Sequence, residues 1–223
     1  MGRVNGLRTE PTKIGNSSTA TNEANRALAA LADHVGADRF VLGRPPGKAD
    51  TLLRDADKNP NTRGAHAAAG DGVRHEAELS LQIAGRAYEA VIFLDDEGEV
   101  SGVVRSSLSS LTSVILSDRR NALSDACTIR LPAASWAEIV GTYTNRQGRL
   151  RVIRPAWRIE DDRRPRAELV RELLLALGGR DIGTAREQSR AIAEEFEHEG
   201  LLELLADPQP ARPRLLRFGN SRG

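Results

Sequence analysis

Residues 90–116, with the sequence AVIFLDDEGEVSGVVRSSLSSLTSVIL, decide the fold class of this chain. The stretch opens with an unbroken apolar run, 90–94, which is typical of a strand buried on both faces. A second apolar run follows at 114–116, and between the two runs Val104, Leu108 and Leu111 recur at helical spacing. We therefore predict a strand–helix–strand unit with a right-handed crossover, within an α/β fold whose mainly parallel sheet is flanked by helices.

Further elements are predicted on both sides of this unit. Apolar positions at helical spacing predict a helix over residues 24–35, which Gly36 would end. A Thr-x-x-Glu capping box at Thr184 opens a helix that continues to residue 205. The remaining predicted elements are strands at 39–42 and 127–131, the latter stopped by Pro132, a short helix at 119–125 and a helix at 165–177.

The rest of the chain shows weaker patterns. Residues 1–20 have no periodicity and are predicted to form a flexible tail. Residues 48–72 hold few large apolar side chains, so we expect them to run over the surface, and residues 73–84 fit either a helix or a strand, with the helix favoured. The predicted organisation is a tail at 1–20, an α/β domain at 21–160, a C-terminal helical extension at 161–206, and a Pro- and Arg-rich tail at 207–223.

Composition excludes several classes of function. The 223 residues carry a net charge of +1, which argues against nucleic acid as the main partner because phosphate binding needs a surplus of basic residues. The single cysteine, Cys127, allows neither an internal disulfide nor a cysteine-ligated iron–sulfur cluster. Apolar runs stay well short of the ~20 residues of a membrane span, and a cytoplasmic protein is expected.

Several stretches that could form functional sites are better explained as ordinary structure. Gly43 and Lys48 enclose a stretch that superficially resembles a phosphate loop, but the spacing is too short and Ala49 follows the lysine. Cys127 is expected to pack as a small apolar side chain, and His34 and His198 are expected to be solvated. The acidic residues that follow buried strands could form a metal or catalytic site at the carboxyl edge of the sheet, although a solvated turn is favoured; they are Asp95, Asp96, Glu97, Glu99 and Asp118.

Residues 131–155 form the most informative stretch, beginning LPAASWAEIVGTYTNRQGR. We predict a strand exit at Pro132, a short helical turn that carries Trp136 and Glu138, and then a polar loop. Two interpretations of the loop remain open. It is either a structural crossover, or a site where Thr144, Asn145 and Arg149 converge on a polar ligand.

This stretch resembles a signature in the C-terminal half of the molybdopterin oxidoreductase family, in particular of the large iron–sulfur subunit of bacterial NADH-quinone oxidoreductase, complex I. Residues 123–132 look like the strand that precedes the signature, and residues 22–36, 57–64 and 184–205 are also similar to that large subunit. The chain departs from the pattern at Ile139 and Val140, where the family has a charged pair, and it lacks the family's N-terminal cysteine clusters.

The resemblance implies a molybdopterin-oxidoreductase-like lobe that is a split or truncated subunit and binds no cofactor by itself. It would serve as a non-catalytic structural domain in a peripheral arm, with iron–sulfur and flavin- or NADH-binding subunits as partners. The alternative is the pterin-contacting portion of a molybdenum or tungsten oxidoreductase of formate dehydrogenase type. In that case Thr144, Asn145 and Arg149 would contact molybdopterin.

Overall fold

The computed structural model describes residues 12–50, 52–70, 88–94, 102–159 and 161–196. Its strands are β1 (Thr12–Ser17), β2 (Asp38–Leu42), β3 (Ala90–Leu94), β4 (Thr112–Ser117), β5 (Ile129–Pro132), β6 (Gly141–Thr144) and β7 (Leu150–Ile153). Its helices are α1 (Asn22–Val35), α2 (Thr62–Ala69), α4 (Gly102–Leu108), α5 (Ala122–Ala126), α6 (Arg166–Ala176) and α7 (Ala185–Glu195), with a 3₁₀ turn, η1 (Trp136–Glu138).

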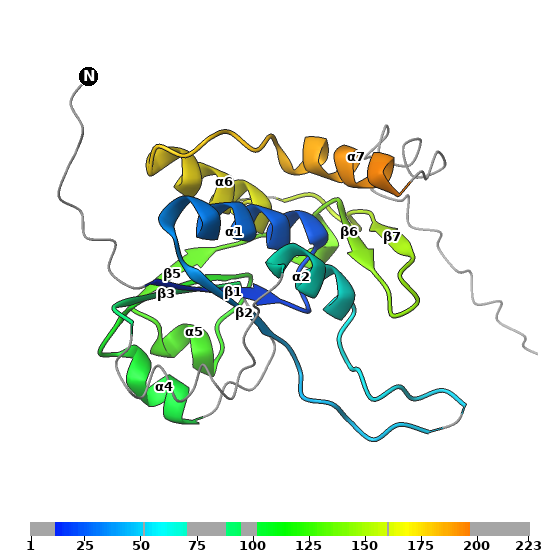
Figure 1. Ribbon diagram of the computed structural model, residues 1–223, viewed down its shortest axis with the longest axis horizontal. Coiled ribbons are helices and arrows are strands. Elements are labelled where there is room, and N and C mark those ends of the chain that lie inside the picture. The colour runs from blue at the N-terminus through cyan, green and yellow to red at the C-terminus, as the bar shows by residue number, and fades with distance from the viewer. Residues whose placement is uncertain (1–11, 51, 71–87, 95–101, 160, 197–223) are drawn as a thin grey trace, which may run out of the picture.

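A five-stranded parallel sheet in the order β2-β1-β3-β4-β5 forms the centre of the fold (Figure 1). Helices α1, α2, α6 and α7 lie on one side of this sheet, and α4 and α5 lie on the other. Each side has its own apolar core, one around Ile14, Leu28 and Val170 and the other around Phe40, Phe93 and Leu108. The predicted α/β class with a mainly parallel sheet is confirmed, as is the β3–α4–β4 unit.

The prediction of a flexible tail is wrong from Thr12 onward, because β1 lies between β2 and β3 inside the sheet. Residues 1–11 lie outside the described ranges. Sequence periodicity missed β1 because Ile14 is its single large apolar residue. Gly15 has a packing role: a Cβ there would lie 2.7 Å from the Phe40 ring, which meets Phe93 edge-on at a centroid distance of 5.9 Å.

Helix α1 follows the prediction closely. The hydroxyl of Thr21 accepts the amide N–H of Ala24 at the first turn, which is the usual N-cap arrangement. Gly36 ends the helix with a φ of 67°, a left-handed conformation that favours glycine. The apolar face of α1 buries Leu28 and Leu31 completely against β1 and α6.

The elements after β4 are confirmed with shifted boundaries. The predicted strand at 127–131 is Ile129–Pro132, so Pro132 belongs to the strand instead of stopping it. Proline is tolerated there because β5 is at the edge of the sheet. The predicted helical turn at Trp136 is confirmed as η1, in which Ser135 and Glu138 form a capping box.

The polar loop predicted after η1 is instead the antiparallel hairpin β6–β7. Its sequence alternates too briefly to indicate strands, and Gly148, with a φ of 81°, forms part of the connecting turn. Residues 62–69, expected on the surface, form α2, whose small residues Gly64, Ala65 and Ala69 are buried. Small side chains allow α2 to pack closely on α1, so few large apolar residues were needed.

Helices α6 and α7 are confirmed in the C-terminal third. Pro165 precedes α6, and the capping box at Thr184 and Glu187 opens α7. Ala167, Val170 and Leu174 of α6 belong to the same core as α1. The continuation of α7 to residue 205 and the element predicted at 73–84 lie outside the described residues. In the part of the chain that is described, no helix has the length and apolar character needed to cross a membrane.

Candidate functional site

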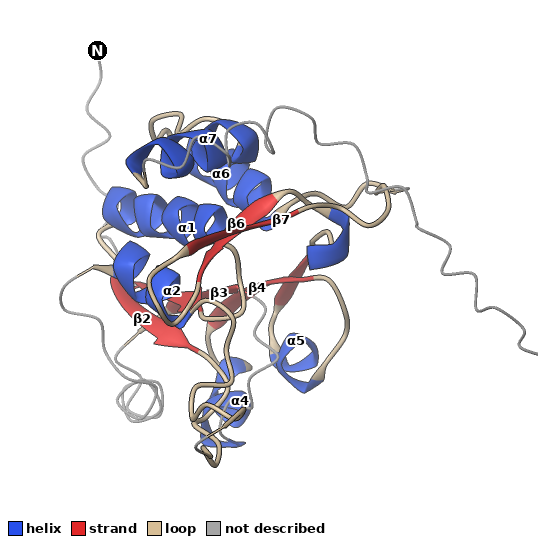
Figure 2. Cartoon of the chain, turned by 90° about the vertical axis from the view of Figure 1, so that its right-hand side faces the viewer, coloured by secondary structure: helices blue, strands red, loops and turns tan. Residues whose placement is uncertain are grey.

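The carboxyl end of β1 is the place where this topology would position a ligand. Helix α1 connects β1 to β2 on one side of the sheet, whereas α4 connects β3 to β4 on the other. The connections therefore diverge between β1 and β3, and α/β sheets bind ligands at such a switch point. The turn after Ser17 and the N-terminus of α1 form this edge, and hairpin β6–β7 lies beside the ends of α1 and α2 (Figure 2).

Asn25 holds the turn between β1 and α1 closed. Its side-chain amide donates to the carbonyl oxygens of Ser17 at 2.9 Å and Thr21 at 3.1 Å, and its Oδ1 accepts the Ser17 amide at 2.8 Å. Asn16 on β1 donates to the carbonyl oxygen of Asn25 at 2.9 Å. Both asparagine side chains are fully buried. The Ser17 amide, which a phosphate loop would offer to its ligand, is thus used within the chain.

Glu23 places the chain's own carboxylate in the first turn of α1. Negative charge is favoured there because the helix dipole is positive at its N-terminus. The carboxylate accepts the Thr142 amide at 3.0 Å, the Thr142 hydroxyl at 2.7 Å and the Ser189 hydroxyl at 2.7 Å. Glu23 therefore joins α1 to β6 and α7.

Asn22 and Asn61 join α1 and the start of α2 to the same hairpin. The side-chain amide of Asn22 donates to the hydroxyls of Thr142 and Thr144, each at 3.1 Å. Asn61 accepts the Thr144 amide at 2.7 Å and donates to the Ala20 carbonyl oxygen at 2.8 Å. We call the buried set of Asn16, Asn22, Glu23, Asn25, Asn61, Thr142 and Ser189, with the partly buried Thr144, the polar junction.

Two glycines allow the hairpin and α2 to approach the polar junction. A Cβ on Gly141 would lie 2.7 Å from Thr21 and 3.2 Å from the Glu23 carboxylate. A Cβ on Gly64 would lie only 1.9 Å from the side-chain oxygen of Asn22. Close backbone approach explains the glycine in the Gly-Thr-Tyr-Thr stretch.

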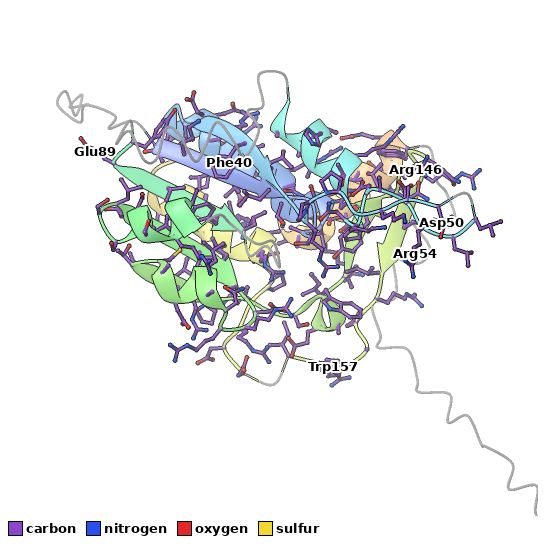
Figure 3. All side chains as sticks on the ribbon, turned by 90° about the horizontal axis from the view of Figure 1, so that it is seen from below. Phe40, Asp50, Arg54, Glu89, Arg146 and Trp157 are labelled. Carbon is purple, nitrogen blue, oxygen red and sulfur yellow. The ribbon has the colours of Figure 1, made fainter. Side chains whose placement is uncertain are left out.

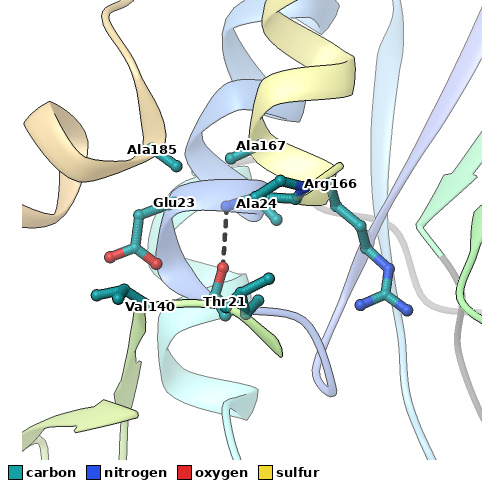
Figure 4. Close-up of a pocket in the computed structure, with 9 residues that line it drawn as sticks. Thr21, Glu23, Ala24, Val140, Arg166, Ala167 and Ala185 are labelled. Atoms are coloured by element: carbon teal, nitrogen blue, oxygen red, sulfur yellow. Dashed lines mark hydrogen bonds between the residues drawn. The ribbon is translucent and has the colours of Figure 1, made fainter. Parts of the chain in front are cut away.

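Two hollows border the junction. Figure 4 shows the first, of about 10 Å³, between Glu23, Val140, Arg166 and Ala185. That volume is at the lower limit for a single water molecule. The second is an open groove of about 510 Å³ between α1 and α2, with Ala29, Ala30, Ala67 and Ala68 in its lining and the ion pairs Arg26–Glu195 and Arg39–Asp33 at its sides.

The three predicted ligand-contacting residues have separate surroundings. Thr144 bonds to Asn22 and Asn61 in the junction. The side-chain oxygen of Asn145 accepts the amides of Gln147 and Arg149 at 3.0 and 2.9 Å, so it shapes the hairpin turn. Arg149 is exposed on the same turn. Ligand contact by these three residues stays a prediction.

The other predicted candidates are placed as follows. Asp118, for which a solvated turn was favoured, is only 12% exposed because Arg166 of α6 covers it at 3.4 Å, so that prediction is wrong. His34 is exposed as expected, and residues 43–48 form a loop. Asp95, Asp96, Glu97, Glu99 and His198 lie outside the described residues. Within the described ranges, no three His, Cys, Asp or Glu side chains come together as a metal site.

Cys127 packs beside the second core, and burial raises the pKa of its thiol to about 11. We expect iodoacetamide at pH 8 to alkylate Cys127 about a hundredfold more slowly than an exposed cysteine, because only the thiolate reacts. Mass spectrometry of time points would measure the rate, and urea should restore it. Equal rates in native and unfolded protein would contradict a protected thiol.

Burial raises the pKa of the Glu23 carboxyl above its usual 4.5, against the hydrogen bonds from Thr142 and Ser189, which lower it. The folded state therefore holds this proton more tightly than the unfolded state does. Its contribution to stability is complete below pH 4.5 and is lost as the pH rises through the folded pKa. We expect the free energy of unfolding of the wild type, relative to that of Glu23→Gln, to fall as the pH rises through the folded pKa. Urea unfolding at each pH would measure this difference. A constant difference would contradict this prediction.

The sequence interpretation missed Asn16, Glu23, Asn25 and Asn61. A usable signal was present, because a threonine cap followed by Asn-Glu-Ala-Asn puts polar residues where the apolar face of α1 begins.

Comparison with protein-family models gave no match, and comparison with curated proteins gave none either.

Proposed function

We propose that this chain is a non-catalytic framework domain in the peripheral arm of an NADH-quinone oxidoreductase, similar to the C-terminal half of the large iron–sulfur subunit. One observation supports this proposal above the others: hairpin β6–β7 and Glu23 occupy the carboxyl edge at β1 with the chain's own groups. Because the chain's own groups take up these hydrogen bonds, we infer that the edge at β1 supplies packing surface and rigidity. Electron transfer would belong to partner subunits.

The thiol chemistry agrees with this role. An iron–sulfur cluster needs several thiolates, and the chain has one cysteine, with a raised pKa. In the proposed assembly, iron–sulfur and flavin- or NADH-binding subunits are the partners.

The test combines metal analysis with reconstitution. The purified chain is expected to be colourless and free of iron, and to co-purify with iron–sulfur and flavin subunits when it is co-expressed with them. A matched comparison uses Thr142→Val, which removes the buried hydroxyl that bonds Glu23, and Thr112→Val, at an exposed strand position. Only Thr142→Val should weaken co-purification. Failure of the wild type to recover any redox subunit would count against the proposal.

Arg149 supports a second candidate, the pterin-contacting portion of a molybdenum or tungsten oxidoreductase. Its guanidinium is exposed and, among the described residues, has no ion-pair partner, so it could bond two phosphate oxygens of a pterin cofactor. Stoichiometric molybdenum or tungsten in protein isolated from cells, and its loss in Arg149→Ala, would favour this candidate over the framework domain.

A further inference from the structure

Residues 43–50 and 52–60 form the two sides of an extended arm that projects from the body between β2 and α2 (Figure 1). The two sides of the arm are hydrogen-bonded to each other. The Gly47 amide donates to the Ala56 carbonyl oxygen at 2.8 Å, and the Asp50 amide donates to the Arg54 carbonyl oxygen at 2.9 Å. These bonds give the arm a defined shape along most of its length.

The base of the arm is also fixed. The side chain of Asn59 accepts the Arg44 amide at 2.7 Å and donates to the Arg44 carbonyl oxygen at 3.1 Å. Asp55 pairs with Arg146 on the turn of hairpin β6–β7, which ties the arm to the polar junction's hairpin. The arm is therefore attached at its root and at its side.

Two leucines occupy the tip. Leu52 is 88% exposed and Leu53 is 94% exposed. The Asp50 carboxylate accepts the backbone amides of Leu52, Leu53 and Arg54 at 2.9, 2.7 and 2.8 Å. Figure 3 shows Asp50 and Arg54 at the outer end of the arm. Because Asp50 bonds the backbone amides of both leucines, the two side chains are held in water at the end of the arm.

The charges on the arm are asymmetric. Its acidic side chains are used internally: Asp50 by the tip amides, Asp55 by Arg146, and Asp57 by the Asn59 amide and side chain. Lys48 and Arg54 are exposed, and neither has an ion-pair partner in the part of the chain that the structure describes. Beside the two leucines, Lys48 and Arg54 outnumber the exposed Asp50 carboxylate by two charges to one, so the tip carries a net charge of +1.

We propose that this is a docking arm, whose leucines enter an apolar pocket with an acidic rim on a partner protein. A membrane is disfavoured because insertion would carry the Asp50 carboxylate toward the hydrocarbon region. A second copy is disfavoured because the acidic side chains beside the α1–α2 groove, Asp33 and Glu195, are already paired with arginines. Identification of the partner as a redox subunit rests on the proposed function; the docking contact does not.

The first experiment is photo-crosslinking in cells that produce the full chain. A benzophenone amino acid replaces Leu53 in one strain and Leu177, which is 52% exposed just after α6, in the control strain. We expect position 53 to crosslink one protein, through a peptide that mass spectrometry identifies as apolar with flanking Asp or Glu. Position 177 should not crosslink that protein.

The second experiment measures affinity for the purified, crosslinked protein. Leu52→Ser and Leu53→Ser are each expected to weaken binding about tenfold or more, since burying a leucine contributes at least that factor. The double variant Lys48→Glu/Arg54→Glu should also weaken binding, and this loss should grow as the salt concentration is lowered. The control Leu177→Ser should leave affinity unchanged. Melting curves of all variants should match the wild type, because the substituted side chains are exposed.

Four results would overturn the docking arm: no protein crosslink from Leu53, a crosslink only to a second copy, the same partner captured from Leu177, or flotation of the chain with phosphatidylcholine–phosphatidylserine vesicles that depends on both leucines. A specific partner that is not a redox subunit would leave the docking arm standing and would contradict the proposed function. The two proposals can therefore fail separately.

Discussion

Replacing Glu23 with alanine is expected to lower the free energy of unfolding by about 3 kcal/mol or more. The substitution leaves the Thr142 amide, the Thr142 hydroxyl and the Ser189 hydroxyl buried without their acceptor, and each unsatisfied buried group costs roughly 1–3 kcal/mol. Removal of a buried charge returns part of the desolvation cost, so the loss is smaller than the sum of these terms. Urea unfolding monitored by circular dichroism would measure it.

Two further variants define what Glu23 contributes. Glu23→Gln keeps an oxygen for the Thr142 amide, and its NH₂ can donate to hydroxyls that rotate, so a loss of only about 1 kcal/mol is expected. Glu172→Ala on the exposed face of α6 should change stability by less than about 0.5 kcal/mol. If Glu23→Ala behaved like Glu172→Ala, the carboxylate would not be joining the three elements.

Replacing Gly64 with alanine is expected to destabilise the protein by about 2–3 kcal/mol, even though alanine is the better helix former. The added Cβ would lie 1.9 Å from the Asn22 oxygen and 2.2 Å from the Asn61 oxygen, so α2 or both asparagines must move. Overpacking of this kind typically costs about 1–3 kcal/mol, and disturbed buried hydrogen bonds add to it. The gain in helix propensity, about 1 kcal/mol, offsets only part of the cost.

Gly102→Ala provides the matched control, because Gly102 is also helical and a Cβ there would meet none of the described residues within 4 Å. This variant should be neutral or slightly stabilising. Opposite signs for the two glycine substitutions, measured in the same urea series, are the expected result. Equal effects would mean that α2 does not press on the polar junction.

Much of the fold could be predicted because its signals are local. The apolar runs of β3 and β4, the threonine cap and Gly36 of α1, and the capping box of α7 each act within a few residues. Their physical causes, burial of a continuous apolar strand and satisfaction of the first helix amides, can be recognised without knowing the rest of the molecule.

The candidate site could not be predicted in the same way. Asn22 and Thr144 are 122 positions apart in the chain, and Glu23 and Ser189 are 166 apart. Hairpin β6–β7 looked like a loop because its short strands are specified by pairing and by contacts with α1. Likewise, β1 looked like a tail because its polar side chains meet their partners only in the folded chain: the Asn16 amide donates to the Asn25 carbonyl oxygen, and the Lys13 ammonium lies 3.8 Å from the Asp38 carboxylate of β2.

Periodicity, capping and composition are properties of the chain alone, and they were enough to establish the α/β class, the β3–α4–β4 unit, the ends of the main helices and the scarcity of thiols. Three outcomes emerged only from the folded arrangement: β1 is an interior strand, Glu23 and the hairpin meet beside the carboxyl end of β1, and Leu52 and Leu53 stand out in water. They depend on which distant groups meet, and buried polar residues reveal their role only when their partners are in place.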